Sequence, residues 1–192
     1  MRIVFSSHIR MLRTAAVTAL ALIFAASASA ARTSTDQDVL AKVAATCAGA
    51  TNANASAVDE LHAMYCGVNV VRSSFRRRMV HGDAKLARSS LMKADEIRRC
   101  GFSHTPCGTS FSRTFQLAGY HNPKRVFAEN LAWGQYQLGS PVQTLGAWLA
   151  SPRHRANLLS RRWCAAGIAF QHGTMFGYSS VSLWVLELGN RR

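Results

Sequence analysis

His104, Glu129 and His154 are the residues best suited to chemistry, because each carries an ionisable group among aromatic or small apolar neighbours. Such surroundings are typical of a buried polar cluster. Imidazole titrates near neutrality and binds Zn well, so His104 is a candidate proton carrier or metal ligand. Glu129 interrupts the otherwise uncharged run Val126–Leu138, and a carboxylate that faces inward there must find a partner. A nearby histidine is the obvious partner, and Glu129 would then act as a general base.

Each of these residues also has a purely structural interpretation. His104 can hydrogen-bond the neighbouring backbone or a carboxylate, and Glu129 can form an ion pair that fixes its strand against a loop. Asn130 could orient the same cluster through its amide, or it could satisfy a turn. His154 follows a Ser-Pro pair that suits the N-cap and first position of a helix, so architecture explains part of that segment.

Three short segments carry a resemblance to a known family. They read Phe-Ser-His at 102–104, Ala-Glu-Asn-Leu-Ala-Trp-Gly at 128–134 and Ser-Pro-Arg-His-Arg-Ala-Asn-Leu-Leu at 151–159. In motif, order and spacing the chain resembles the bacterial branch of the CAP superfamily, also called SCP-like proteins, from about Val58 to Gly189. The resemblance implies an α-β-α sandwich with a central cleft that His104 lines.

The resemblance covers only part of the cleft chemistry of eukaryotic CAP proteins, which have two His and two Glu there. Only His104 and Glu129 match that set, because Ser151 stands at the place of the second Glu and the closing strand has no His. We expect His104, Glu129, Asn130 and His154 to line a ligand cleft, with the first two as the catalytic candidates. No cofactor is expected, and a divalent metal such as Zn on His104 and His154 is the open alternative.

The elements that must position these side chains are predicted from apolar spacing and cap residues. Helices are expected from Ser56, from Asp83 to Gly101, over Ser110–Ala118, from Ser140 to Ala150, and after Pro152. The second of these should face inward with Leu86, Ser90, Leu91, Ala94 and Ile97. Strands are expected over Val126–Trp133, Cys164–Gln171 and Val181–Gly189, the last two joined by a loop at Gly173–Gly177. Without regular βα alternation, this order favours an α+β fold with a small, mainly antiparallel sheet.

The N-terminal segment lies outside the predicted fold. Residues 1–30 are typical of a secretory signal, with three arginines, an apolar stretch and the small cleavage-site residues Ala28-Ser29-Ala30. A membrane-anchoring helix is the alternative, although the uncharged run is short and Ala-rich for that role. Residues 31–54 are predicted to be an extended lead-in and residues 55–190 the CAP-like domain. We therefore expect a secreted, extracellular or envelope-associated protein with no stable transmembrane segment after cleavage.

Five cysteines without metal-ligand spacing favour an oxidising compartment and disulfides. A Cys47–Cys66 pair would clip the lead-in onto the first helix, and a Cys100–Cys107 pair would close the turn that carries His104. Cys164 would then be left out of both. Spacing alone also allows Cys164 to pair with Cys66 or Cys100, because connectivity does not follow from one sequence.

The chain is strongly cationic, with a formal net charge of +14. Removal of a signal with three arginines would leave about +11, still enough to favour anionic wall polymers or phospholipid head groups as partners. The basic residues are scattered and fit no nucleic-acid-binding motif, so nucleic acid is not expected as a partner. A merely solvated basic surface is the alternative interpretation. Oligomeric state is not predicted.

Three functions remain after these observations. The favoured one is a non-enzymatic binding module that holds a lipid, sterol-like or cell-envelope ligand in the cleft. The second is an envelope peptidase or other hydrolase, in which His104 and Glu129 activate water or polarise a carbonyl. The third is a cationic structural or defence protein. No nucleophile elbow, HExxH motif or P-loop occurs in the chain.

Overall fold

The structure is a computed structural model that describes residues 35–121 and 126–190. By contacts the chain divides into two compact units, residues 1–38 and 39–192. Within the first unit only residues 35–38 are described, and they are helical. The predicted signal peptide at 1–30 lies outside the described residues. None of the described helices is long and apolar enough to cross a membrane.

The second unit begins with a helix that the sequence prediction missed. Residues 39–46 are helical, so the predicted extended lead-in is wrong there. Val39, Val43 and Cys47 recur every four residues along this stretch and are buried in the core. That spacing places them on one helical face, although the Ala-rich surroundings obscure it in the sequence. Cys47 forms the predicted disulfide with Cys66.

The two long helices begin at the predicted caps. Helix α2 spans Ala57–Ser74, and the Ser56 side chain accepts a hydrogen bond from the Asp59 backbone N–H. Helix α3 spans Ala84–Cys100, and the Asp83 carboxylate accepts from the backbone N–H groups of its first turn. It ends at Gly101, whose φ of 100° is costly for other residues. Local capping chemistry therefore sets these boundaries.

Within the described residues, one sheet of four strands forms the middle of the fold, in the order β1-β3-β4-β2. Strands β2, β3 and β4 span Phe127–Gln135, Ala165–Met175 and Tyr178–Gly189, and their pairings are antiparallel. The two-residue strand β1, His81–Gly82, pairs parallel to β3 and was not predicted. Strand β2 lies at an edge of the sheet, so its outer side is available to a site.

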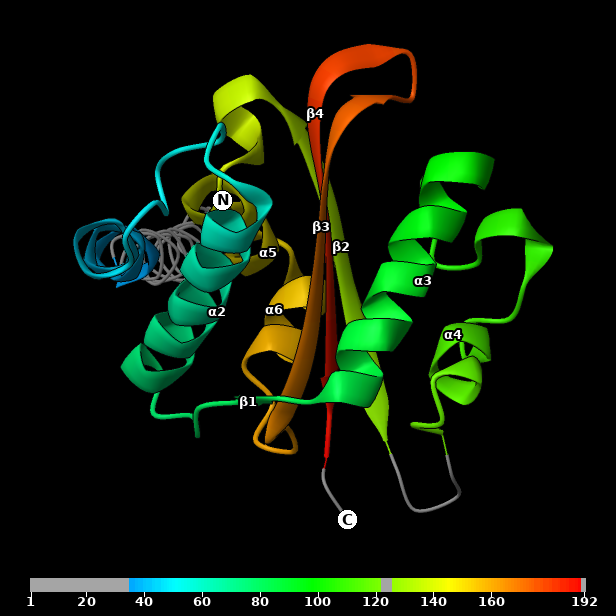
Figure 1. The fold of residues 1–192 in the computed structure, drawn as a ribbon. Coiled ribbons are helices and arrows are strands. Elements are labelled where there is room, and N and C mark those ends of the chain that lie inside the picture. The colour runs from blue at the N-terminus through cyan, green and yellow to red at the C-terminus, as the bar shows by residue number, and fades with distance from the viewer. Residues whose placement is uncertain (1–34, 122–125, 191–192) are drawn as a thin grey trace, which may run out of the picture. The chain divides into compact units, whose positions relative to one another are not determined.

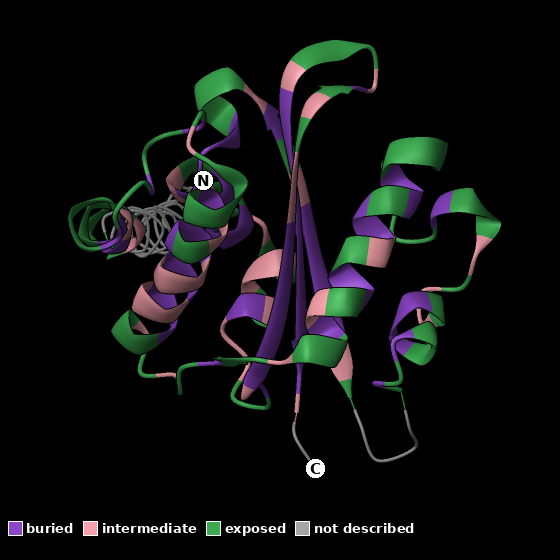
Figure 2. Cartoon of the chain, viewed as in Figure 1, coloured by how far each residue is buried: buried purple, intermediate pink, exposed green. Residues whose placement is uncertain are grey.

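Helices cover both faces of the sheet, as predicted for a three-layer α-β-α sandwich (Figure 1). Helices α2, α5 (Pro141–Ala150) and α6 (Pro152–Leu158) lie on one face, and α3 and the short α4 (Arg113–Leu117) lie on the other. The prediction for α4 was too long, because Ser110–Ser112 form a turn before the helix. Figure 2 shows the buried strands between the two helical layers.

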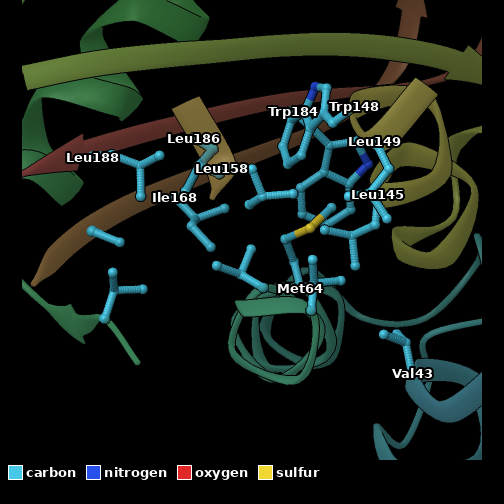
Figure 3. Packing of buried hydrophobic residues seen from close by; sticks show 14 of the residues in the cluster. Val43, Met64, Leu145, Trp148, Leu149, Leu158, Ile168, Trp184, Leu186 and Leu188 are labelled. Atoms are coloured by element: carbon cyan, nitrogen blue, oxygen red, sulfur yellow. The ribbon is translucent and has the colours of Figure 1, made fainter. Parts of the chain in front are cut away.

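The larger core lies between the sheet and α2. Met64 points from α2 toward Trp148 of α5 (Figure 3), and Trp184 of β4 is buried in the same cluster. A second cluster, with Ala94 and Ile97, lies under α3. The predicted inward position of Leu91 is wrong, since it is 50% exposed. The other four predicted inward residues of α3 are buried, and three residues that were not predicted, Ser89, Lys93 and Glu96, are buried with them.

Glu60 is a buried carboxyl in the first turn of α2. Burial raises its pKa from 4.5 to about 7, against a smaller lowering by the Ala55 backbone. The folded chain therefore holds a proton that the unfolded chain loses, and stability falls as pH rises from 4.5 towards 7. We expect Glu60→Gln to raise the free energy of unfolding by about 1–3 kcal/mol at pH 8 and to change it little at pH 4. Urea unfolding at both pH values measures this, and equal gains at both would contradict it.

Candidate functional site

A cleft of about 540 Å³ lies at the edge strand β2, between the loop that follows α3 and helix α6. Three of the predicted site residues, His104, Glu129 and His154, line it together. The full lining is His104, Phe111, Phe127, Ala128, Glu129, Ser151, Arg153, His154 and Asn157.

His104 and Glu129 form the closest polar contact in the cleft. His104 Nδ1 lies 2.6 Å from Glu129 Oε1, with the imidazole half exposed and the carboxylate fully buried. The carboxylate fixes the ring proton on Nδ1, which leaves Nε2 as the nitrogen able to act on a ligand. The loop is held by the predicted Cys100–Cys107 disulfide. The expected histidine partner of Glu129 is therefore confirmed.

Lys93 completes this cluster and was not found from the sequence. Its Nζ lies 3.6 Å from Glu129 Oε2, and both side chains are fully buried. The same Nζ donates a hydrogen bond to the backbone oxygen of His104 at 2.8 Å. Lys93 thus compensates the buried carboxylate and anchors the loop beside it. One signal was available: Lys93 lies seven residues after Leu86 and four before Ile97, two of the residues predicted to face inward.

Glu187 is a second buried acid, directly across from Glu129 on β4. Its Oε1 accepts a hydrogen bond from Ser89 Oγ at 2.9 Å. Burial raises the pKa of Glu187 well above its usual value, and the charge of Glu129 raises it further. The site therefore favours a protonated Glu187, and the ammonium group of Lys93 faces Glu129.

Two amides fasten α6 to β2. Asn130 Nδ2 donates to the backbone oxygen of His154 at 3.0 Å. Asn157 Nδ2 donates to the backbone oxygen of Glu129 at 3.1 Å and to Asn130 Oδ1 at 3.0 Å. Asn130 is buried behind the cleft and does not line it, so its predicted place on the surface of the cleft is wrong. Its amide ties β2 to the backbone of His154 in α6.

Burial lowers the pKa of His154, and the nearby His104 lowers it further. His154 therefore favours the neutral imidazole at neutral pH, able to donate or accept a hydrogen bond. Ser151 occupies the N-cap position of α6, as predicted, but its side chain makes no capping bond. Ser151 is also one of the residues that line the cleft.

The sequence-family model for CAP, the cysteine-rich secretory protein family, matches residues 67–187, more than half of the chain. The chain belongs to the CAP family. No curated protein matches it.

Three solved structures with the same fold come from bacteria. An extracellular protein with an SCP domain from Bacillus anthracis is 17% identical with a TM-score of 0.55, over 71% of this chain and 44% of that one. An outer surface protein from Borrelia burgdorferi is 18% identical with a TM-score of 0.58, and the match covers 72% of this chain and 97% of that one. A cysteine-rich secretory protein from Staphylococcus aureus is 14% identical with a TM-score of 0.53, and the match covers 72% of this chain and 41% of that one. This chain thus spans less than half of the first and third, and at these identities the likeness shows the fold alone.

The donor set of this CAP domain does not fit the Zn site suggested for His104 and His154. Glu129 Oε1 is engaged by His104 Nδ1, and Oε2 faces Lys93. Across residues 35–121 and 126–190, no three His, Cys, Asp or Glu side chains gather closely enough to hold a metal ion. A tetrahedral protein site needs at least three such ligands.

Proposed function

We propose that this CAP protein is a secreted or envelope-associated binding module whose cleft holds the anionic head group of an amphipathic envelope ligand, such as a lipid. The observation that carries the proposal is the internal neutralisation of Glu129. This residue is the only acid among the described residues that line the cleft, and it is buried against Lys93 and His104. The remaining polar lining is neutral or cationic, which suits an anion.

The lining also combines polar and aromatic side chains. Arg153 is exposed, and with His104 and His154 it supplies donors for a phosphate or carboxylate. Phe111 and Phe127, with ring centroids 5.8 Å apart, offer apolar surface to a chain or ring, and Phe111 meets the His104 ring edge-on at 6.3 Å. A ligand with one anionic end and one apolar end matches both kinds of side chain.

Hydrolysis is the second candidate, and the 2.6 Å contact between His104 and Glu129 favours it. In that reaction His104 Nε2 would take a proton from water or from the Ser151 hydroxyl, while Glu129 stabilises the imidazolium. Glu129 itself is fully buried, so it would act only through His104. We prefer the binding function because it accounts for the polar and the aromatic residues of the lining together, whereas hydrolysis accounts for only two or three of them.

Calorimetric titration with dodecyl phosphate below its micelle concentration tests the binding proposal. We expect Arg153→Gln to weaken binding about fivefold and Phe111→Ala about tenfold, from a lost charged hydrogen bond and lost apolar contact. Arg161→Gln, an exposed arginine outside the cleft, is the matched control and should leave the affinity unchanged. Dodecyl maltoside, which has the same tail and a neutral head, should bind more weakly than dodecyl phosphate.

Absence of dodecyl phosphate binding, or an affinity that neither Arg153→Gln nor Phe111→Ala lowers, would refute the proposal. An equal loss of affinity for dodecyl phosphate in Arg153→Gln and Arg161→Gln would also refute the proposal. It would indicate a general charge effect, as in a cationic structural or defence protein. Turnover of an ester or peptide substrate that His104→Gln and Glu129→Gln both abolish would establish the hydrolase.

A further inference from the structure

Four aromatic side chains form a connected cluster at one end of the sheet, which we name the aromatic end: Phe102, Trp133, Phe176 and Tyr178. Trp133 stacks on Tyr178 with ring centroids 5.6 Å apart and contacts Phe176 at 5.5 Å. Phe176 meets Phe102 edge-on at 6.1 Å. Trp133, Phe102 and Tyr178 are nonetheless 38%, 43% and 49% exposed. A contiguous exposed aromatic patch of this kind marks an interaction surface.

The backbone holds further apolar surface outward at the same end. Phe176 and Tyr136 have φ values of 58° and 49°, in the left-handed region that costs a bulky residue about 1–2 kcal/mol. Tyr136 lies in the 3-10 helix η2, Tyr136–Gly139, with the exposed Leu138. Figure 1 shows η2, the β3–β4 turn and the last turn of α3 at one end of the fold.

The rim of the aromatic end is basic. Arg98 and Arg99 are exposed in the last turn of α3, just before Phe102. Arg98 also lines a hollow with Thr174 and Met175, next to Phe176. The segments that build this end, residues 98–103, 131–139 and 172–184, contain no Asp or Glu. Asp95, one turn earlier on α3, accepts a hydrogen bond from Gln171 at 2.6 Å.

We propose that the aromatic end docks on the surface of an anionic phospholipid bilayer. Trp and Tyr rings suit the boundary between head groups and acyl chains, where one part of the side chain is apolar and the other is wet. Arginines beside them attract anionic head groups. The aromatic end shares no residue with the lining of the cleft, so this docking does not rest on the proposed function.

Flotation with vesicles of phosphatidylcholine alone, or with an equal part of phosphatidylglycerol, tests the docking. We expect binding only to the mixed vesicles, weakened by about 0.5 M NaCl, and about tenfold weaker for Tyr178→Ser. Phe176→Gly removes a ring and also relieves the left-handed backbone, so it should lose binding about tenfold without a large loss of thermal stability. Met79→Ser, an exposed apolar residue outside the aromatic end, should bind like wild type.

Tryptophan emission gives a second, local readout. Trp133 is the exposed one of the four tryptophans, since Trp148, Trp163 and Trp184 are no more than 5% exposed. Brominated phosphatidylglycerol should therefore quench part of the emission of wild type, and Trp133→Phe should remove that quenching while the protein still floats.

Several results would overturn the docking. One is vesicle binding by Tyr178→Ser and Phe176→Gly that is as strong as that of wild type, and another is flotation of wild type without quenching of its tryptophan emission. The docking would also be refuted by retention on purified peptidoglycan with no vesicle binding. A dimer in sedimentation velocity that Tyr178→Ser converts to a monomer would refute it as well. A loss of dodecyl phosphate binding in Arg153→Gln with unchanged flotation would separate the cleft from the aromatic end.

Discussion

Lys93→Met is expected to lower the free energy of unfolding by about 3–5 kcal/mol, the cost of leaving a buried charge without its partner. Lys93 and Glu129 are both fully buried, with Nζ and Oε2 3.6 Å apart. Methionine keeps the length of the side chain but removes the ammonium group. Glu129 would retain only His104, and the loop would lose the 2.8 Å hydrogen bond to its backbone. Urea unfolding measures the loss.

A matched variant separates the lost ion pair from a change in helix propensity. Lys85 lies on the same helix and is exposed, so Lys85→Met should change stability by less than about 0.5 kcal/mol. The double variant Lys93→Met/Glu129→Gln should recover part of the loss, because it removes the unpaired charge. A Lys93→Met protein as stable as Lys85→Met would show that the pair contributes nothing.

Arg72→Met should cost a similar amount, about 3–4 kcal/mol, because four backbone oxygens lose their donor. Arg72 is fully buried and donates to the carbonyl oxygens of Arg78, Leu158, Ser160 and Trp163 at 2.8, 2.6, 3.2 and 3.2 Å. The guanidinium therefore fastens α2 to the loop that follows α6. Arg72→Lys should recover little of the lost free energy of unfolding, since an ammonium group cannot reproduce the planar arrangement of guanidinium N–H donors.

Hydrogen exchange of the backbone amides shows which part of the chain Arg72→Met destabilises. Amides of residues 158–163 should exchange faster in Arg72→Met, and those of α3 should not. Arg88→Met, an exposed arginine on α3, is the control and should leave both rates unchanged. Uniform acceleration across the domain, or none, would contradict the anchoring role.

The parts of this fold that local chemistry decides were predictable from the sequence. Ser56 and Asp83 cap their helices as expected, and the apolar patterns of β2 and β4 place the strands correctly. His104 and Glu129 were paired correctly because a lone acid in an apolar strand requires a partner. The signal peptide, the ligand and any hydrolysis remain predictions.

The missed features depend on residues far apart in the chain. Arg72 meets Leu158 across 86 positions, and Ser89 meets Glu187 across 98. Local patterns do not show which groups compensate a buried basic or acidic residue, because those groups come from other elements. Ser151 shows the reverse case: its N-cap position followed from the Ser-Pro pair, but its side chain makes no capping bond, and the residue lines the cleft.

The loop closed by Cys100–Cys107 carries Phe102 of the aromatic end and His104 of the cleft. Two residues apart, their Cα atoms are separated by no more than about 7 Å. A bilayer held by Phe102 would therefore present its head groups to the mouth of the cleft at a high effective concentration. Capture of a lipid from that bilayer becomes an intramolecular step, and a weak intrinsic affinity of the cleft would suffice at the membrane while leaving it empty in solution.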